Sequence, residues 1–145
     1  MRPPLEERLL RLGEHIATWS TCWVKHGAVI ARGNRIISMG YNGSKPGEEH
    51  CIDVGCLLER GHCRRTIHSE VNAINWAKAC GLGHLLEGAE AYVTGSPCPD
   101  CARALAEAGI KKVIYRCAYR GYVPDVPGVE WIEWGWGSYG KQRNE

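Results

Sequence analysis

Hydrophobic positions follow first a helical and then a strand-like spacing along the first third of the chain. The first run repeats every three or four residues and predicts an amphipathic helix over residues 4–19. Its apolar positions are Leu5, Leu9, Leu12, Ile16 and Trp19. Two short apolar runs follow at 28–31 and 36–41. The four residues between them include Gly33 and Asn34, and together these features predict a β-hairpin.

The rest of the chain alternates strands and helices after one irregular stretch. Residues 42–66 are rich in Gly, Cys and His and show no clean period, which is typical of a functional loop. Beyond them, the pattern predicts two helices and three strands. The helices are at 69–79 and 99–108, and the strands are at 91–94, 112–116 and 129–134. This alternation predicts an α/β protein with three layers, α/β/α. We expect the 145 residues, 1–145, to form a single domain.

Composition narrows the classes of function. Lysine and arginine number 18 against 16 acidic residues, so the net charge of +2 gives no electrostatic argument for a polynucleotide partner. No apolar run approaches the length of a membrane-spanning helix, and the N-terminus lacks the apolar core of an export signal. We therefore expect a cytoplasmic protein without a membrane partner. Eight cysteines and six histidines then favour metal binding over a disulfide framework.

Two short motifs carry the candidate chemistry. His68 and Glu70 open one predicted helix, and Cys98 and Cys101 open another 28 residues after Glu70. A helix N-terminus favours the thiolate that zinc requires. Three protein ligands with an open fourth position are typical of catalytic zinc, so we expect His68, Cys98 and Cys101 to hold the metal. Positions two apart on a helix do not face each other, so Glu70 is expected to act beside the ligands rather than as a fourth one.

Each motif alone has an ordinary explanation. A His-x-Glu occurs often by chance, and a Cys-x-x-Cys can be a redox pair or half of a structural zinc ribbon. In this order, and each at a helix start, they match the His-x-Glu … Pro-Cys-x-x-Cys signature of zinc nucleobase deaminases. The sequence therefore predicts a catalytic zinc with Glu70 as its proton-transfer group.

A second group of cysteines lies in and before the irregular stretch. Its members are Cys22, Cys51, Cys56 and Cys63, with His50 and His62 adjacent. Their spacings suit a second, structural zinc that would tie the loop to the start of the hairpin. The alternative is that they are reduced cysteines, some of them buried. Which four of the six candidates would ligate stays open.

The motifs resemble the deoxycytidylate (dCMP) deaminase family of the cytidine-deaminase-like superfamily, including its phage and bacterial members. The resemblance runs from about residue 20 to 120, through the stretches 27–30, 40–43, 65–74, 92–94 and 96–101. It implies the three-layer fold with a central mixed sheet and a zinc at His68, Cys98 and Cys101. It also implies that Glu70 acts as proton shuttle while dCMP and water become dUMP, for dTMP synthesis, and ammonia.

The resemblance also suggests substrate contacts and an assembly. Asn42 matches a family position at the sugar hydroxyl, and Tyr119 falls near a family tyrosine beside the substrate. Backbone groups around Ser96 are expected to hold the amino group. Arg65, with Arg64, could clamp a phosphate or form a solvated loop edge. Many relatives carry a second zinc, and the family suggests a homohexamer in the cytoplasm of a bacterium or phage-infected host.

The chain departs from the family pattern in two places. Ser69 stands where the family usually has Ala, and we expect this position to act mainly through its backbone. The family commonly has a helix after the strand near Arg116, and here a loop runs through Gly128. The tryptophans near the C-terminus, 131, 134 and 136, predict an exposed apolar patch.

Two rival functions stay open. One is a deaminase of another cytosine substrate, such as deoxycytidine, dCTP or a 5-modified dCMP. The other is a catalytically silent zinc module that only binds nucleotides. Glu70 argues against the second, because a structural zinc has no need of an acid at that place.

Overall fold

A five-stranded mixed sheet forms the centre of the protein, which is represented by a computed structural model. The structure describes residues 2–44, 47–55, 58–59, 62–63, 66–116 and 124–135. The strand order is β2-β1-β7-β8-β9. The bounds are β1 Gly27–Arg32, β2 Arg35–Tyr41, β7 Glu90–Val93, β8 Lys112–Tyr115 and β9 Glu130–Glu133. β1 is antiparallel to β2 and β7, whereas β7, β8 and β9 are mutually parallel. The predicted hairpin and mixed sheet are confirmed.

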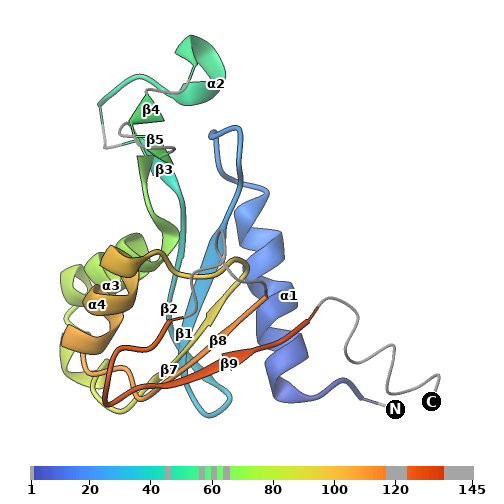
Figure 1. Cartoon of the computed structure of the whole chain (residues 1–145), viewed down its shortest axis with the longest axis vertical. Helices are drawn as coiled ribbons and strands as arrows, with labels where there is room; N and C mark the ends of the chain where they lie inside the picture. Colours follow the sequence, from blue (N-terminus) through green and yellow to red (C-terminus); the bar gives the residue numbers. More distant parts are fainter. Residues whose placement is uncertain are drawn as a thin grey trace.

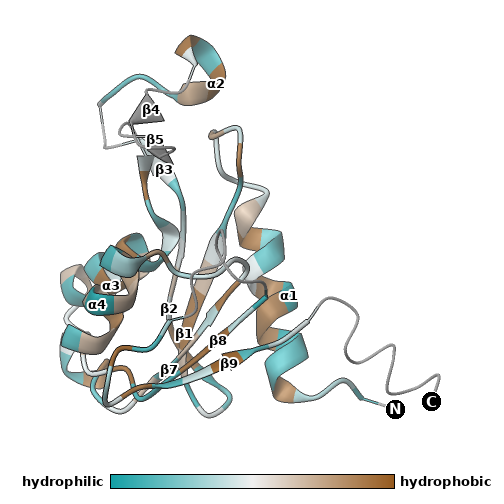
Figure 2. Cartoon of the chain, viewed as in Figure 1, coloured by the Kyte–Doolittle hydropathy of each residue, from teal (hydrophilic) through white to brown (hydrophobic). Residues whose placement is uncertain are grey.

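The three inner strands are buried on both faces, so consecutive residues contribute to two separate cores. One core contains Ala28, Ile30, Ala91, Val93 and Val113 and receives Ala73, Ile74 and Leu105 from helices. The other contains Val29, Ala31, Tyr92 and Ile114 and receives Leu9 and Leu10 from the first helix. Figure 2 shows apolar strands at the centre and hydrophilic residues on the outer sides of the helices. Burial on both faces explains the short continuous apolar runs in the sequence.

Three helices cover the sheet. α1 (Leu5–Ala17) lies on one face, and α3 (Ser69–Ala79) and α4 (Pro99–Glu107) lie on the other (Figure 1). The predicted three-layer order is therefore confirmed. α1 and α3 approach the sheet through glycines. A Cβ at Gly27 would lie 2.0 Å from the Gly13 carbonyl oxygen of α1, and one at Gly40 would lie 2.6 Å from the Ser69 carbonyl oxygen of α3.

Short elements occupy the stretch that has no period in the sequence. They are β3 (Gly43–Ser44), α2 (Cys51–Val54), β4 (Leu58–Glu59), β5 (His62–Cys63) and β6 (Thr66–Ile67), and a 3-10 turn η1 (Gly83–Leu85) follows α3. β3 pairs with β6, and β4 pairs with β5. α2 is hydrogen-bonded to the middle of the α1–β1 connection. The Ile52 N–H donates to the Thr21 carbonyl at 3.0 Å, and the Trp23 indole donates to the Cys51 carbonyl at 3.0 Å.

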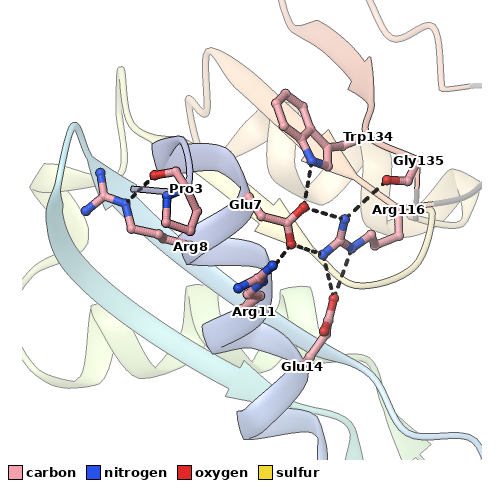
Figure 3. A network of polar contacts seen from close by, with 8 residues as sticks. All are labelled: Pro3, Glu7, Arg8, Arg11, Glu14, Arg116, Trp134 and Gly135. Atoms are coloured by element: carbon pink, nitrogen blue, oxygen red, sulfur yellow. Dashed lines mark hydrogen bonds and ion pairs between the residues drawn. The ribbon is translucent and has the colours of Figure 1, made fainter. Parts of the chain in front are cut away.

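A buried ionic network joins the end of β8 to α1 (Figure 3). Arg116, 2% exposed, donates from Nη2 to Glu7 Oε2 and Glu14 Oε1, both at 2.8 Å. The Trp134 indole donates to Glu7 Oε1 at 3.1 Å. These contacts hold the C-terminal side of the sheet against α1.

The prediction of an exposed tryptophan patch is wrong for two of its three members. Trp131 packs against the α3–α4 core and donates to the Val126 carbonyl, while Trp134 packs against the α1 core. Tryptophan 136 lies outside the described residues. Among the described residues, no helix is long and apolar enough to cross a membrane.

Candidate active site

The N-termini of α3 and α4 bring the sequence motifs together. His68 is the N-cap residue of α3, and Cys98 is the N-cap residue of α4, where Pro99 occupies the first turn. Cys101 follows one turn into α4, and its N–H donates to Cys98 Sγ at 3.5 Å. Proline suits this position because the first helical N–H needs no partner within the helix. Two helix starts thus meet, with their positive dipole ends directed at the sulfur atoms.

The three predicted ligands form one cluster with the spacing of a metal site. His68 Nδ1 lies 3.1 Å from Cys101 Sγ and 3.6 Å from Cys98 Sγ. All three donor atoms lie within 4.8 Å of one another, and both cysteines are buried. Tetrahedral zinc takes thiolates at about 2.3 Å and imidazole nitrogens at about 2.0–2.1 Å, which places its ligands at comparable mutual distances. The donor set and its spacing therefore fit zinc.

The sulfur atoms share charge unequally. The hydrogen bond from the Cys101 thiol, with further ones from His68 and the Cys101 N–H, outweighs burial and lowers the pKa of Cys98 to about 3. Cys101 donates to that thiolate, so its own pKa is raised, with burial and the Glu70 charge acting in the same direction. The hydrogen bond to Cys98 raises the pKa of His68 against the effect of burial. This concentration of negative charge suits a cation.

Glu70 is buried beside this cluster. The residue is 5% exposed, and the charge of its carboxylate raises the pKa values of both His68 and Cys101. Within the part of the chain that the structure describes, the ligand cluster comprises three residues and Glu70 is not one of them. The arrangement agrees with a carboxylate that reaches the reacting groups from the side.

Ser69 has a contact that the sequence analysis did not anticipate. Its hydroxyl donates to Glu70 Oε1 at 2.8 Å, and the residue is fully buried. The Ser69 side chain therefore adds a contact to the backbone role expected at this position. A serine here orients the carboxylate directly, which an alanine could not do.

The predicted substrate residues are only partly described. Asn42 is buried, and its side chain contacts backbone: Oδ1 accepts from the His26 N–H at 2.8 Å, and Nδ2 donates to the Val24 carbonyl at 2.7 Å. Ser96 lies between β7 and α4, half-buried, on the path to Cys98. Arg65 and Tyr119 lie outside the described residues.

Part of the second cysteine group also comes together. Cys22 Sγ lies 2.9 Å from Thr66 Oγ1, and Cys51 Sγ lies 3.6 Å from the same oxygen. Both cysteines are buried. Cys56 and the Cys63 side chain lie outside the described residues, so the four-cysteine site stays a prediction.

Sequence reasoning also missed a second histidine at the site. Burial lowers the pKa of His26, and the charges of both Glu70 and His68 act on its ring. No motif surrounds His26 in the sequence. The one available signal was its position directly before the apolar run of β1.

Comparison with known proteins places this geometry in a family. Residues 5–117 match the sequence model of the cytidine and deoxycytidylate deaminase zinc-binding region. The chain belongs to this family. The matched residues include the His68–Cys98–Cys101 cluster, so the family and the donor atoms both support zinc binding.

Individual relatives agree with that assignment. ComE operon protein 2 of Bacillus subtilis (strain 168) is 46% identical over 106 residues, which are 72% of this chain and 55% of that protein. Deoxycytidylate deaminase of Enterobacteria phage T4 is 39% identical over 132 residues, 65% of this chain and 67% of the phage protein. The chain therefore spans about half to two thirds of the length of these relatives.

A solved structure covers nearly the whole fold. The dCMP deaminase from the cyanophage S-TIM5, in complex with dCMP and dUMP, has a TM-score of 0.74 and 33% identity, and the match covers 92% of this chain and 99% of that chain. The mixed sheet between two helical layers is thus the cytidine-deaminase-like fold expected from the sequence.

Proposed function

We propose that the protein is a zinc-dependent dCMP deaminase, which converts dCMP and water to dUMP and ammonia and so supplies dUMP for dTMP synthesis. The observation that carries this function is the buried carboxylate of Glu70 beside the His68–Cys98–Cys101 cluster. The similarity to a cyanophage enzyme whose structure contains dCMP and dUMP supports the choice of substrate.

The ligand cluster would hold one zinc ion through His68 Nδ1 and the two sulfur atoms. When bound, zinc supplies Lewis acidity that makes water a nucleophile near neutral pH. The helix N-termini favour the ionised form of the sulfur atoms, and a bound zinc ion would also take Cys101 as a thiolate. The buried setting strengthens every charge at the site.

Glu70 then performs the proton transfers. Its carboxylate accepts a proton from the attacking water and delivers it to the ring nitrogen N3, which makes C4 electrophilic. The water oxygen bonds to C4. Glu70 then takes the remaining proton of that oxygen and passes it to the amino nitrogen, as the C4–N bond breaks and ammonia leaves. Ser69 holds the carboxylate in place through its hydrogen bond to Oε1.

The contacts to the rest of the nucleotide belong to this proposal. Backbone groups around Ser96 hold the amino group, Tyr119 lies beside the substrate, and Arg65 clamps the 5′-phosphate in bidentate geometry. Asn42 contributes at the sugar. Its side-chain amide already binds two backbone groups, so its contribution rests largely on positioning its neighbours.

A nucleotide panel tests the proposed substrate. Ammonia release from dCMP is expected to exceed that from deoxycytidine, CMP, dCTP and 5-methyl-dCMP by a wide margin in the zinc-loaded protein. Equal or better turnover of deoxycytidine would contradict the nucleotide assignment. No release from any cytosine substrate would leave the silent nucleotide-binding module as the better description.

A second zinc ion, structural in role, is part of the same proposal. The convergence of Cys22 and Cys51 on Thr66 supports it, with Cys56 and Cys63 as the remaining ligands. Metal analysis should give two zinc ions per chain, and Cys56→Ser should remove about one and destabilise the fold. A single zinc that is lost entirely in His68→Ala would contradict the second site.

Assembly into a homo-oligomer, a hexamer by family resemblance, completes the proposal. β2 lies at the sheet edge and exposes Ile36, Met39 and Tyr41, and the neighbouring Trp19 is 58% exposed. Exposed apolar edges of this kind favour association with another copy. Analytical ultracentrifugation should show a defined oligomer, and a monomer at all concentrations would contradict it. A cytoplasmic location stays a prediction.

A further inference from the structure

His26 lies where β1 begins and where β2 and β7 end. In the β1–β2 register Gly27 faces Tyr41, and in the β1–β7 register Ala28 faces Val93. Extended by one residue, the β1–β2 register pairs His26 with Asn42. Extended by two residues, the β1–β7 register pairs His26 with Gly95. Hydrogen bonds confirm the first pairing, because the Asn42 N–H donates to the His26 carbonyl at 3.2 Å and the His26 N–H donates to Asn42 Oδ1 at 2.8 Å.

Contacts on the other side fix His26 against β7. The Thr94 N–H donates to the Gly27 carbonyl at 3.0 Å, and the Gly27 N–H donates to Thr94 Oγ1 at 3.1 Å. The His26 ring lies directly against Gly95. A Cβ at Gly95 would lie 2.8 Å from Cε1 and 2.9 Å from Nδ1 of the imidazole. The chain reaches Cys98 three residues after Gly95, so the ring lies near the metal-ligand cluster.

The imidazole is held in position, but its hydrogen-bonding capacity is not used by the described residues. It is half-buried, and among the described residues no hydrogen bond is formed by either ring nitrogen. The charges of Glu70 and His68 both reach it. The backbone is fixed on two sides, and the ring keeps its donor and acceptor available within reach of the Glu70 charge. This combination is typical of a ligand-binding residue.

We propose that His26 is a substrate-contacting residue whose imidazole contacts the pyrimidine base and sets its orientation toward Glu70. This inference rests on the proposed deaminase function. Glu70 acts at N3 and at the C4 amino group, so the groups in its immediate surroundings face the base. The 5′-phosphate is separated from C4 by the sugar and the ring, which makes the base the part of the nucleotide that His26 meets.

Two variants that act on the same ring test this role. His26→Ala removes the imidazole, and Gly95→Ala introduces a methyl group into the space that the imidazole fills. Each should raise KM for dCMP by about tenfold with kcat changed much less, which corresponds to about one lost hydrogen bond or ring contact. His84→Ala, at an exposed histidine of η1, is the matched control and should leave KM unchanged.

The double variant separates a ring contact from general damage. If Gly95→Ala acts by displacing His26, it should cost little more once the imidazole is gone, so the two effects should not add. Fully additive effects, or an unchanged KM in His26→Ala, would overturn the proposal. Zinc content and melting temperature verify that each variant folds. If His26→Ala does not fold, His26→Gln provides the comparison of KM with the wild type.

A binding measurement distinguishes this inference from the proposed function. Calorimetry with dUMP, the product, gives an affinity that requires no turnover. Wild-type protein that binds dUMP but releases no ammonia from any substrate would contradict the deaminase function, and a weaker dUMP affinity in His26→Ala would still support the base contact. Equal dUMP affinity in both proteins would overturn the base contact whatever the activity.

Discussion

Two buried polar clusters lie on opposite sides of the sheet and differ in how their charges are balanced. The Arg116 network on the α1 side matches two guanidinium groups, those of Arg116 and Arg11, with the carboxylates of Glu7 and Glu14, and the Trp134 indole adds a further donor. The His68–Cys98–Cys101 cluster on the α3–α4 side combines a thiolate, a thiol and an imidazole next to the carboxylate of Glu70.

This difference in charge balance indicates that the Arg116 network has a structural role and that the His68–Cys98–Cys101 cluster has a chemical one. Buried charges that neutralise one another within the fold stabilise it only modestly, and breaking such a set is costly. Buried groups that leave excess negative charge need a partner from outside the chain, and for two sulfurs and an imidazole that partner is a metal ion. Charge balance therefore predicts which cluster binds a ligand.

The largest expected effect follows removal of a metal ligand. Changes in groups that only support metal ligands typically cost about 10–100-fold in metal affinity or activity. Loss of a ligand itself should cost more, so Cys98→Ala should reduce dCMP turnover by more than about 100-fold. Zinc content should fall with it, as measured by elemental analysis. Cys80→Ala, at an exposed free cysteine, is the control and should retain both metal and activity.

The Arg116 network should respond in stability instead. Arg116→Met leaves the buried Glu7 without its main partner, and removing one member of a buried pair costs about 3–5 kcal/mol. Urea unfolding of the zinc-loaded protein measures this loss, while zinc content should stay at the wild-type value. Arg103→Met removes an exposed ion pair with Asp100 and should cost less than about 1 kcal/mol. Loss of zinc in Arg116→Met would remove the distinction between the two clusters.

Acid should weaken the same network. The hydrogen bond from Arg116 holds the pKa of Glu7 below 4.5, against the effect of burial. A carboxyl group whose pKa is lowered by folding contributes stability above its unfolded value of 4.5, and this contribution is lost as the pH falls through the lower folded value. Melting temperatures between pH 6 and pH 3 should therefore fall more steeply in wild type than in Glu7→Gln. Equal slopes would contradict the assignment, and Glu6→Gln is the neighbouring control.

The smallest effect concerns Ser69. Ser69→Ala removes the hydrogen bond to Glu70 Oε1 but leaves the carboxylate and the ligands intact. A hydrogen bond to a charged group contributes about 1.5–3 kcal/mol, and only the part that differs in the transition state affects the rate. We expect kcat to fall by less than about tenfold with zinc content unchanged. A fall as large as that of a ligand variant would mean that Ser69 supports the metal as well.

The sequence predicted the parts of the molecule that repeat or cluster locally. The helix Ser69–Ala79 is confirmed at both ends, and the other predicted helices and strands agree to within two residues. The ligand cluster was predictable because zinc chemistry restricts residue types, and both motifs lie at helix starts. Periodicity also predicted a helix that continued to Trp19, although α1 ends at Ala17 and Trp19 is exposed.

The missed features all depend on contacts between distant segments. Arg116 meets Glu7 across 109 positions of the chain, and on its own each reads as an ordinary surface residue. His26 gains its place at the site only when β1 pairs with β7 and Gly95 leaves room for the ring. Ser69 looked like a backbone position because its helix start was clear but the direction of its side chain was not.

Glu70→Gln provides the most direct test of the central claim, that a buried carboxylate transfers protons beside a three-ligand metal site. Glutamine keeps the shape of the side chain but cannot accept a proton. Turnover of dCMP should fall by at least about 10²-fold, the lower range of general acid–base catalysis, while zinc content and melting temperature stay at wild-type values. Ammonia release and zinc content are measured on the same preparation. Retention of most activity, or loss of zinc together with activity, would contradict the account.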